Sequence, residues 1–261
     1  MVKYRNYRDE NSSHVSNEAC ADEYESGNKR KNMDKRYILF DLDGTLTDSY
    51  EGIVNALKYC LSKYGIEPKP ESFGNIIGPP VIWSLKTFYN IEGEQAMEAL
   101  KYFREYYDKQ GYLENKLYPG VEEMLKTLVA HDKKLLLATS KPEIMAHKVI
   151  EHFGLEDYFC FIAGSTAENE SDRGYVDTAK TAVRSTKEDV IGYALKTNGI
   201  LDPEHAVMVG DRVWDIKAAK QFGLQTIGVS YGYAEPGELE QAGADQIAAV
   251  PMQLVEMIVQ S

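Results

Sequence analysis

The sequence predicts an α/β protein with a doubly wound, Rossmann-like parallel sheet and an inserted all-helical cap. Short apolar runs bounded by polar or glycine residues recur along the chain, and sequence with helical periodicity follows them. About ninety residues without a convincing strand separate the first run from the second, which is far more than a direct connection needs. Aspartates and hydroxyl residues follow several runs, at the strand ends where an open α/β sheet keeps its active site.

The elements can be assigned in chain order. Residues 1–34 are polar and mixed in charge, so we expect a disordered tail. The run YILF predicts the first strand at 37–40, and apolar positions at helical spacing predict helices within 50–118. Pro119 and Gly120 then open the next helix, so we expect a cap at 50–118 and an α/β core at 35–49 and 119–261. The later strands are expected at 134–139, 158–164, 205–211, 225–230 and 245–250.

The net charge and composition of the chain argue against several classes of binding partner and location. A formal net charge of -12 argues against binding to nucleic-acid polymers or membrane surfaces, since both require clustered Lys and Arg. The sequence shows neither a secretory signal nor an apolar stretch of membrane-spanning length, so we expect a cytoplasmic protein. The cysteines and histidines are scattered without metal-ligand spacing, which argues against a zinc site.

Polar residues at the strand ends predict one shared site. They are Asp41, Asp43, Gly44 and Thr45 after the first strand, Thr139, Ser140 and Lys141 after the second, and Asp211 with Asp215 after the run at 205–211. Carboxylates that meet in one crevice repel each other unless a cation lies among them. Ligation by oxygen alone favours Mg²⁺, which also takes substrate phosphate as a ligand. The sequence therefore predicts a magnesium site that binds a small phosphorylated metabolite.

Four motifs carry a resemblance to a known family. DLDGTLTDS begins at Asp41, LLATSKP ends at Pro142, Lys187 precedes EDVIGYAL, and VMVGDRVWDIKAA contains Asp211. Together, in this order and spacing, they resemble the haloacid dehalogenase superfamily of phosphohydrolases. The helical insertion and local stretches such as IGPP at 77–80 resemble its phosphoglycolate phosphatase and 5'-nucleotidase branch.

The resemblance implies a role for each matched residue. Asp41 would be the nucleophile that forms an aspartyl-phosphate, and Asp43 would be the general acid and base. Thr139 and Lys187 would stabilise the transferring phosphoryl group. The implied phosphate contacts are Gly44, Thr45, Thr139, Ser140 and Lys187. The implied Mg²⁺ ligands are Asp41, the main-chain carbonyl of Asp43, Asp211 and Asp215, the last through water unless it orients the lysine.

Several alternatives stay open at this point. The long loop at 165–186 leaves Lys180 and Lys141 as alternatives to Lys187 for the catalytic lysine. Arg212 is interpreted as an ion-paired surface residue. Nucleoside 5'-monophosphates are the first substrate class, followed by phosphoglycolate or another small phosphomonoester. A sugar-phosphate mutase and a non-catalytic regulatory protein are further alternatives, and a homodimer is expected only from its frequency among soluble enzymes.

Overall fold

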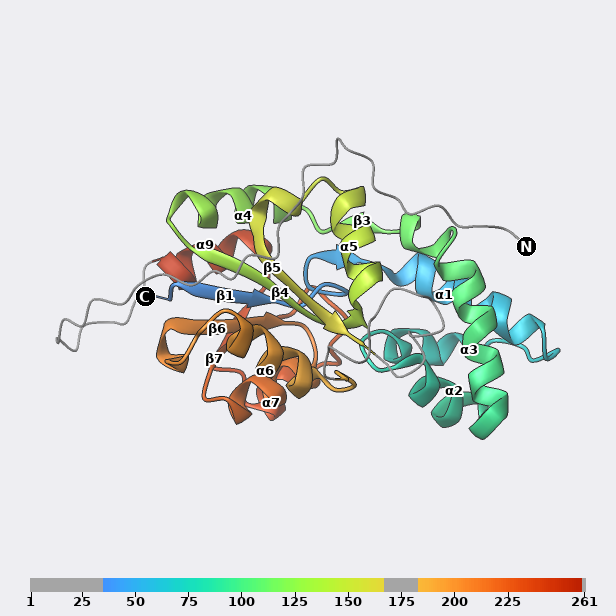
Figure 1. Ribbon diagram of the computed structural model, residues 1–261. Helices are drawn as coiled ribbons and strands as arrows, with labels where there is room; N and C mark the ends of the chain where they lie inside the picture. The colour runs from blue at the N-terminus through green and yellow to red at the C-terminus, as the bar shows by residue number, and fades with distance from the viewer. Residues whose placement is uncertain (1–34, 167–182, 260–261) are drawn as a thin grey trace.

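A six-stranded parallel sheet forms the centre of the computed structural model, which describes residues 35–166 and 183–259 (Figure 1). The strands are β1 (Tyr37–Phe40), β4 (Lys134–Pro142), β5 (Phe159–Ser165), β6 (Ala206–Gly210), β7 (Gln225–Val229) and β8 (Gln246–Ala248). Their order is β5-β4-β1-β6-β7-β8, and each neighbouring pair is parallel. Each predicted apolar run corresponds to one of these strands, so the predicted fold class is confirmed.

Helices cover both faces of the sheet, which explains why its strands are apolar on both sides. One face carries α4 (Val121–Ala130), α5 (Glu143–His152) and α9 (Pro251–Val259), and the other carries α6 (Lys187–Thr197) and α7 (Val213–Gln221) (Figure 1). Successive side chains of β1 point to opposite faces: Phe40 packs in the first core and Leu39 in the second. A short helix, α8 (Glu238–Ala242), follows β7.

Residues 50–118, called here the cap segment, contain helices that share a separate apolar core. The helices are α1 (Tyr50–Ser62), α2 (Val81–Tyr89) and α3 (Gly93–Tyr107), with a 3₁₀ turn at Pro70–Ile76. Two short strands, β2 (Thr47–Asp48) and β3 (Lys116–Leu117), pair antiparallel at the ends of the segment. The 3₁₀ turns elsewhere are Gly111–Leu113, Glu156–Tyr158 and Pro203–His205. The segment is helical, which is consistent with the expected insertion, and its assignment as a cap domain stays a prediction.

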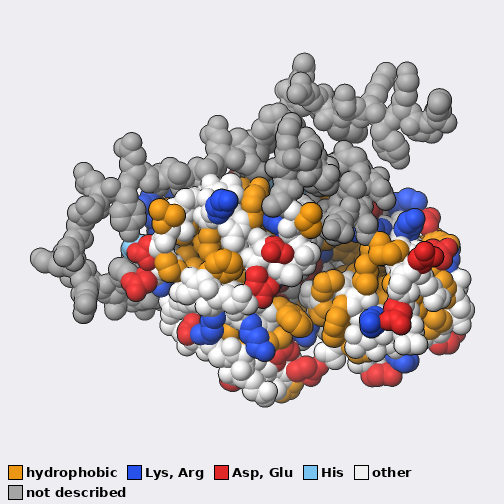
Figure 2. Space-filling view, turned by 60° about the horizontal axis from the view of Figure 1, so that its bottom comes forward, with side chains coloured by type: hydrophobic (Ala, Val, Ile, Leu, Met, Phe, Trp, Pro, Cys, Tyr) orange, Lys and Arg blue, Asp and Glu red, His pale blue; other side chains and the backbone are white. Residues whose placement is uncertain are grey.

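The predicted tail at 1–34 lies outside the described residues, as do Lys180 and residues 167–182 of the long loop. No described helix is long and apolar enough to cross a membrane. On the described part of the face in Figure 2, Lys and Arg side chains are interspersed with Asp and Glu. Basic and acidic side chains are therefore mixed on that part of the surface.

Arg184 anchors the chain where it returns from the long loop. Its side chain is buried, its Nε donates to the Gly164 carbonyl at 2.9 Å, and its Nη2 contacts Glu143 Oε2 at 2.6 Å. The guanidinium also lies 4.0 Å from the ring centroid of Tyr193. Thr166 and Arg184 form an antiparallel bridge. These contacts fix the chain shortly before Lys187, whose position in the site depends on them.

We predict that Arg184→Ala destabilises the protein, because it leaves Glu143 unpaired beside β5. The free energy of unfolding should fall by about 3 kcal/mol, the lower end of the range for a broken buried ion pair, since Glu143 is partly exposed. Denaturant unfolding measures this loss. Glu143→Gln with Arg184→Ala completes a double-mutant cycle, and additive losses would show that the pair itself contributes nothing.

Candidate active site

The carboxyl ends of β4, β1 and β6 lie side by side and carry the candidate site. The Asp41 backbone N–H donates to the Val209 carbonyl at 2.9 Å, so Asp41 is held in line with the sheet. A tight turn follows, in which Gly44 has a φ of +90°. A Cβ on Gly44 would collide with the carboxylate of Asp211, so the turn needs glycine both for its backbone angle and for this close approach.

Lys187 joins two of the predicted aspartates. Its Nζ lies 2.7 Å from Asp41 Oδ1, 2.7 Å from Asp215 Oδ1 and 3.0 Å from the Ala138 carbonyl. Thr186 caps the helix that begins at Lys187 by accepting from the Asp189 backbone N–H. Asp215 is fixed in turn, because its Oδ2 accepts from the Arg212 backbone N–H at 3.0 Å. Among the described lysines, Lys187 is therefore the one that holds Asp41, and Asp215 orients it.

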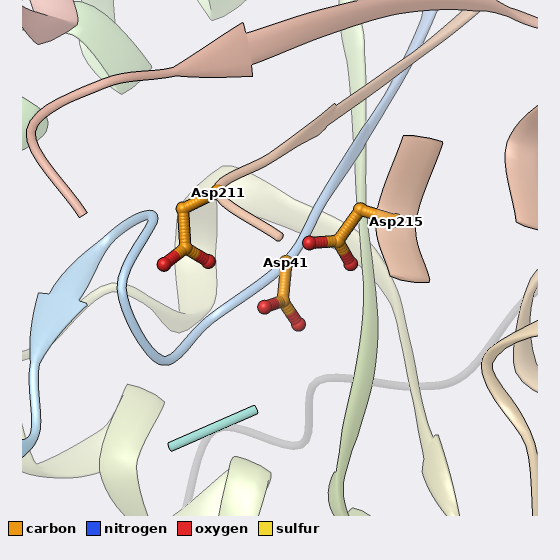
Figure 3. A group of neighbouring side chains, drawn as sticks. All are labelled: Asp41, Asp211 and Asp215. Atoms are coloured by element: carbon orange, nitrogen blue, oxygen red, sulfur yellow. The ribbon is translucent and has the colours of Figure 1, made fainter. Parts of the chain in front are cut away.

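Three buried carboxylates converge at this point, as Figure 3 shows: Asp41 follows β1, Asp211 follows β6 and Asp215 lies on α7. Burial raises the pKa of Asp41 to about 6, Lys187 partly opposes this rise, and Asp215 adds to it. Burial and the neighbouring Asp215 and Asp41 also raise the pKa of Asp211 well above its ordinary value. Burial alone would lower the pKa of Lys187, but Asp215 and Asp41 outweigh burial and raise it.

This cluster fits a divalent cation. Asp41, Asp211 and Asp215 each offer a carboxylate oxygen, and these oxygens lie within 4.8 Å of one another. Within residues 35–166 and 183–259, the ammonium of Lys187 is the cation that pairs directly with this cluster, and one positive charge leaves most of the charge of three ionised carboxylates unbalanced. A donor set of carboxylate oxygens is the kind that Mg²⁺ prefers. These three aspartates were predicted as ligands, and their burial together supports that prediction.

Asp43 has a different partner, Lys141. The Lys141 Nζ lies 2.6 and 2.8 Å from the two Asp43 carboxylate oxygens, and both side chains are buried. The ammonium also lies 4.9 Å from the ring centroid of Tyr107, which belongs to α3 in the cap segment. Burial alone would lower the pKa of Lys141, but Asp43 and Tyr107 raise it. Lys141, one of the two alternatives to Lys187, is thus present in the site, but it pairs with Asp43 and not with Asp41.

A cavity of about 190 Å³ lies between the strand ends and the cap segment. Asp41, Asp43, Thr139, Ser140 and Lys141 border it on the core side. The cap side is largely apolar and is formed by Ile53, Ile76, Val81, Ile82, Leu100 and Phe103, with Arg104, Tyr107 and Asp108 as its polar members. A phosphate beside Asp41 would therefore leave the rest of a substrate facing the cap segment.

Three predicted phosphate contacts do not border this cavity. Thr45 is buried, and its Oγ1 donates to Asp211 Oδ1 at 3.4 Å, so its hydroxyl supports the carboxylate cluster. Gly44 is packed against Asp211. Their roles as phosphate contacts stay predictions. Lys187 also lies behind Asp41, away from the cavity wall.

Arg212 is ion-paired, as the sequence predicts, but its predicted placement at the surface is wrong. Its side chain is buried, its Nε contacts Glu238 Oε1 at 2.9 Å, and its Nη1 donates to the Ile77 carbonyl at 2.6 Å. Arg212 therefore connects the loop after β6 to the cap segment. The contact of Tyr107 with Lys141 and that of Arg212 with Ile77 were not predicted from the sequence, because both depend on how the cap segment packs on the core.

Comparison with known proteins settles the family. The haloacid dehalogenase-like hydrolase family matches residues 38–229, which include the strand ends described above. The chain belongs to this family. A 5'-nucleotidase from Pseudomonas aeruginosa is 36% identical over 203 residues, covering 77% of this chain and 86% of that protein. A phosphoglycolate phosphatase from Psychrobacter arcticus is 30% identical over 224 residues, covering 80% of this chain and 89% of that protein.

A solved structure agrees with this haloacid dehalogenase-like fold. The crystal structure of a predicted phosphatase from Clostridium acetobutylicum has a TM-score of 0.77 and 38% sequence identity, covering 87% of this chain and 100% of that one. Another relative, tyrosine-protein kinase PtkA from Mycobacterium tuberculosis, is 36% identical over 197 residues. The match covers 75% of this chain and 62% of the kinase, so the chain spans less than two thirds of that protein. The family and its phosphatase relatives identify the chain as a phosphoric monoester hydrolase.

The raised pKa of Asp41 predicts a link between pH, metal and stability in this hydrolase. The folded-state pKa of about 6 lies above the ordinary 3.8, so the folded protein holds this proton more tightly than the unfolded chain. The resulting stabilisation is complete below about pH 4 and is lost as the pH rises through about 6. We therefore expect Mg²⁺ to raise the Tm by about 5 °C more at pH 7.5 than at pH 5.

Thermal unfolding in EDTA and in Mg²⁺ at the two pH values measures this difference. Asp211→Asn is the informative control, because it removes one carboxylate from the cluster and should shrink the Mg²⁺ effect at pH 7.5. An equal Mg²⁺ shift at both pH values would mean that the buried carboxylates do not carry the metal response.

Proposed function

We propose that the protein is a Mg²⁺-dependent phosphomonoesterase that acts through an aspartyl-phosphate, with nucleoside 5'-monophosphates as its first substrate class. The observation that carries the proposal is the separation of the two aspartates. Asp41 lies beside the carboxylate cluster and pairs with Lys187, whereas Asp43 pairs with Lys141 at the cavity. Two carboxylates with different partners suit two different tasks, nucleophile and acid–base.

The first half of the reaction transfers the phosphoryl group to the enzyme. An oxygen of Asp41 attacks phosphorus, and a bond forms between that oxygen and phosphorus while the ester bond breaks. Asp43 gives its proton to the departing oxygen, which leaves as an alcohol. Lys187 offsets charge next to Asp41, and the Thr139 hydroxyl at the cavity wall donates to the phosphoryl oxygens.

The second half releases phosphate. Asp43, now ionised, takes a proton from water, and the hydroxide formed attacks the phosphorus of the aspartyl-phosphate. The bond between Asp41 and phosphorus breaks, inorganic phosphate leaves, and Asp43 again carries the proton with which it began. A bound Mg²⁺, held by Asp41, Asp211, the Asp43 carbonyl and Asp215 through water, would neutralise phosphate charge.

The cap side of the cavity supports the nucleotide substrate class. Apolar side chains from three helices line it, and such a wall favours a leaving group with a large uncharged part, such as a nucleoside. The similarity to the Pseudomonas 5'-nucleotidase points the same way. Phe103 and Tyr107 stack with ring centroids 5.7 Å apart, so this wall of the cavity also contains aromatic rings.

Phosphoglycolate is the second candidate, and the polar part of the cavity wall in the cap segment is the observation that favours it. The carboxylate bonded directly to the ester carbon of phosphoglycolate would face the part of the cavity wall that holds Arg104. The similarity to the Psychrobacter phosphoglycolate phosphatase supports this alternative.

The first test is phosphate release from a panel of phosphomonoesters, measured with Mg²⁺ and with EDTA. We expect Mg²⁺-dependent release that is fastest with nucleoside 5'-monophosphates. The panel also includes phosphoglycolate, hexose phosphates and phosphotyrosine. If phosphate release is fastest from phosphoglycolate, the proposed nucleotide substrate class is wrong. Conversion of a hexose phosphate without phosphate release would indicate a mutase.

The second test replaces the nucleophile. We predict that Asp41→Asn lowers kcat by about 10³-fold or more, because an amide cannot attack phosphorus. The variant should also fail to retain ³²P after quenching with acid, whereas the wild type retains an acid-stable phosphoryl group. Asp157→Asn is the matched control, since Asp157 is exposed at the opposite end of the sheet. Near wild-type turnover by Asp41→Asn would remove Asp41 from the nucleophile role.

A further inference from the structure

Lys141 occupies a position that the phosphatase reaction described above does not explain. It lies near the carboxyl end of β4, is buried, and contacts neither Asp41 nor, among the described residues, any carboxylate other than Asp43. A buried ammonium is costly unless it is paired and hydrogen-bonded. Both oxygens of Asp43 satisfy it, so the pair fixes the rotation of the Asp43 carboxyl group.

The other side of the Lys141 ammonium is closed by the cap segment. Its Nζ lies 4.9 Å from the ring centroid of Tyr107, within the range of a cation–π interaction. The Tyr107 ring is itself held by stacking against Phe103 at an interplanar angle of 13°. The ammonium is thus enclosed between a ring from the cap segment and the carboxylate of the core.

We infer that Lys141 is a positioning residue that sets the orientation of Asp43 for proton donation to the leaving group, and that Tyr107 makes this orientation depend on the packed cap segment. The inference rests on the proposed acid–base role of Asp43. When Asp43 carries its proton, one oxygen still accepts from the ammonium, and the O–H is left to face the ester oxygen in the cavity. Without Lys141 the carboxyl group can rotate, and its proton is no longer directed at the ester oxygen.

Leaving-group chemistry can test this role. An alkyl oxygen leaves slowly unless it is protonated, whereas p-nitrophenolate is stable as an anion and hardly needs the acid. The kcat/KM reports the steps up to departure of the leaving group, so it isolates the half-reaction in which Asp43 acts as an acid. The ratio of the two kcat/KM values within one variant is also insensitive to the fraction of correctly folded enzyme.

We predict that Lys141→Met lowers kcat/KM for adenosine 5'-monophosphate by about 100-fold and for p-nitrophenyl phosphate by less than about 5-fold. If phosphoglycolate is the better substrate of the wild type, it replaces the nucleotide in the assay. Lys141→Arg should restore most of the wild-type ratio of the alkyl to the aryl kcat/KM, because a guanidinium can still donate to both Asp43 oxygens. The matched control is Lys196→Met, since Lys196 is exposed on α6.

Two variants of Tyr107 separate the ring from its hydroxyl. Tyr107→Phe keeps the aromatic face toward the ammonium, so it should leave the ratio of the alkyl to the aryl kcat/KM unchanged. Tyr107→Leu removes the aromatic face and should reduce the alkyl reaction about 10-fold more than the aryl reaction. A ratio that falls equally in both variants would show that the ring does not support the ammonium.

Asp43→Asn distinguishes failure of this inference from failure of the proposed function. A selective loss of the alkyl reaction in Asp43→Asn, with an equal loss of both reactions in Lys141→Met, would overturn the role of Lys141 and keep that of Asp43. An equal loss of both reactions in Asp43→Asn would remove Asp43 as the acid, and the inference would fall with it. A selective loss of the alkyl reaction in both Asp43→Asn and Lys141→Met would support the acid role of Asp43 and the positioning role of Lys141.

Discussion

The placement of charge at the sheet edge depends on one constraint: buried carboxylates need cations at hydrogen-bond distance. Asp41 meets Lys187 at 2.7 Å, and Asp43 meets Lys141 at 2.6 Å. The two lysines come from different elements, one from the start of α6 and one from the end of β4. Neighbouring aspartates therefore receive different environments although one residue separates them in the chain.

The rest of the fold supplies the rigidity that this pairing requires. β1 lies in the sheet between β4 and β6, so the ends of three strands meet where the aspartates lie. Arg184 fixes the chain before Lys187, and the α7 N-terminus fixes Asp215 through a backbone hydrogen bond. Positions far apart in the sequence thus hold the site at distances that a flexible loop would not maintain.

Much of this could be predicted from the sequence, because its strongest signals are local. Apolar runs ending in Asp41 and Asp211 identify buried strands and a shared edge without knowledge of the packing. The choice among lysines could not be made, since it depends on which carboxylate each ammonium faces in three dimensions. The contact of Tyr107 with Lys141 and the burial of Arg212 depend on the packing of the cap segment on the core. The two-residue strands β2 and β3 are too short to show any periodicity.

The pairing of β2 with β3 affects how the segment between these two strands can be replaced during evolution. Thr47 and Leu117 are register partners, and the Tyr118 backbone N–H donates to the Leu46 carbonyl at 3.1 Å, so the chain leaves and re-enters the core at neighbouring points. A segment whose two ends lie together can be exchanged for another without moving the elements that it joins. The reactive aspartates precede this junction or lie well beyond it in the chain. A different helical segment inserted here could thus change the residues that face the leaving group while the reacting aspartates stay the same. The reaction type and the substrate preference of such proteins can therefore evolve separately.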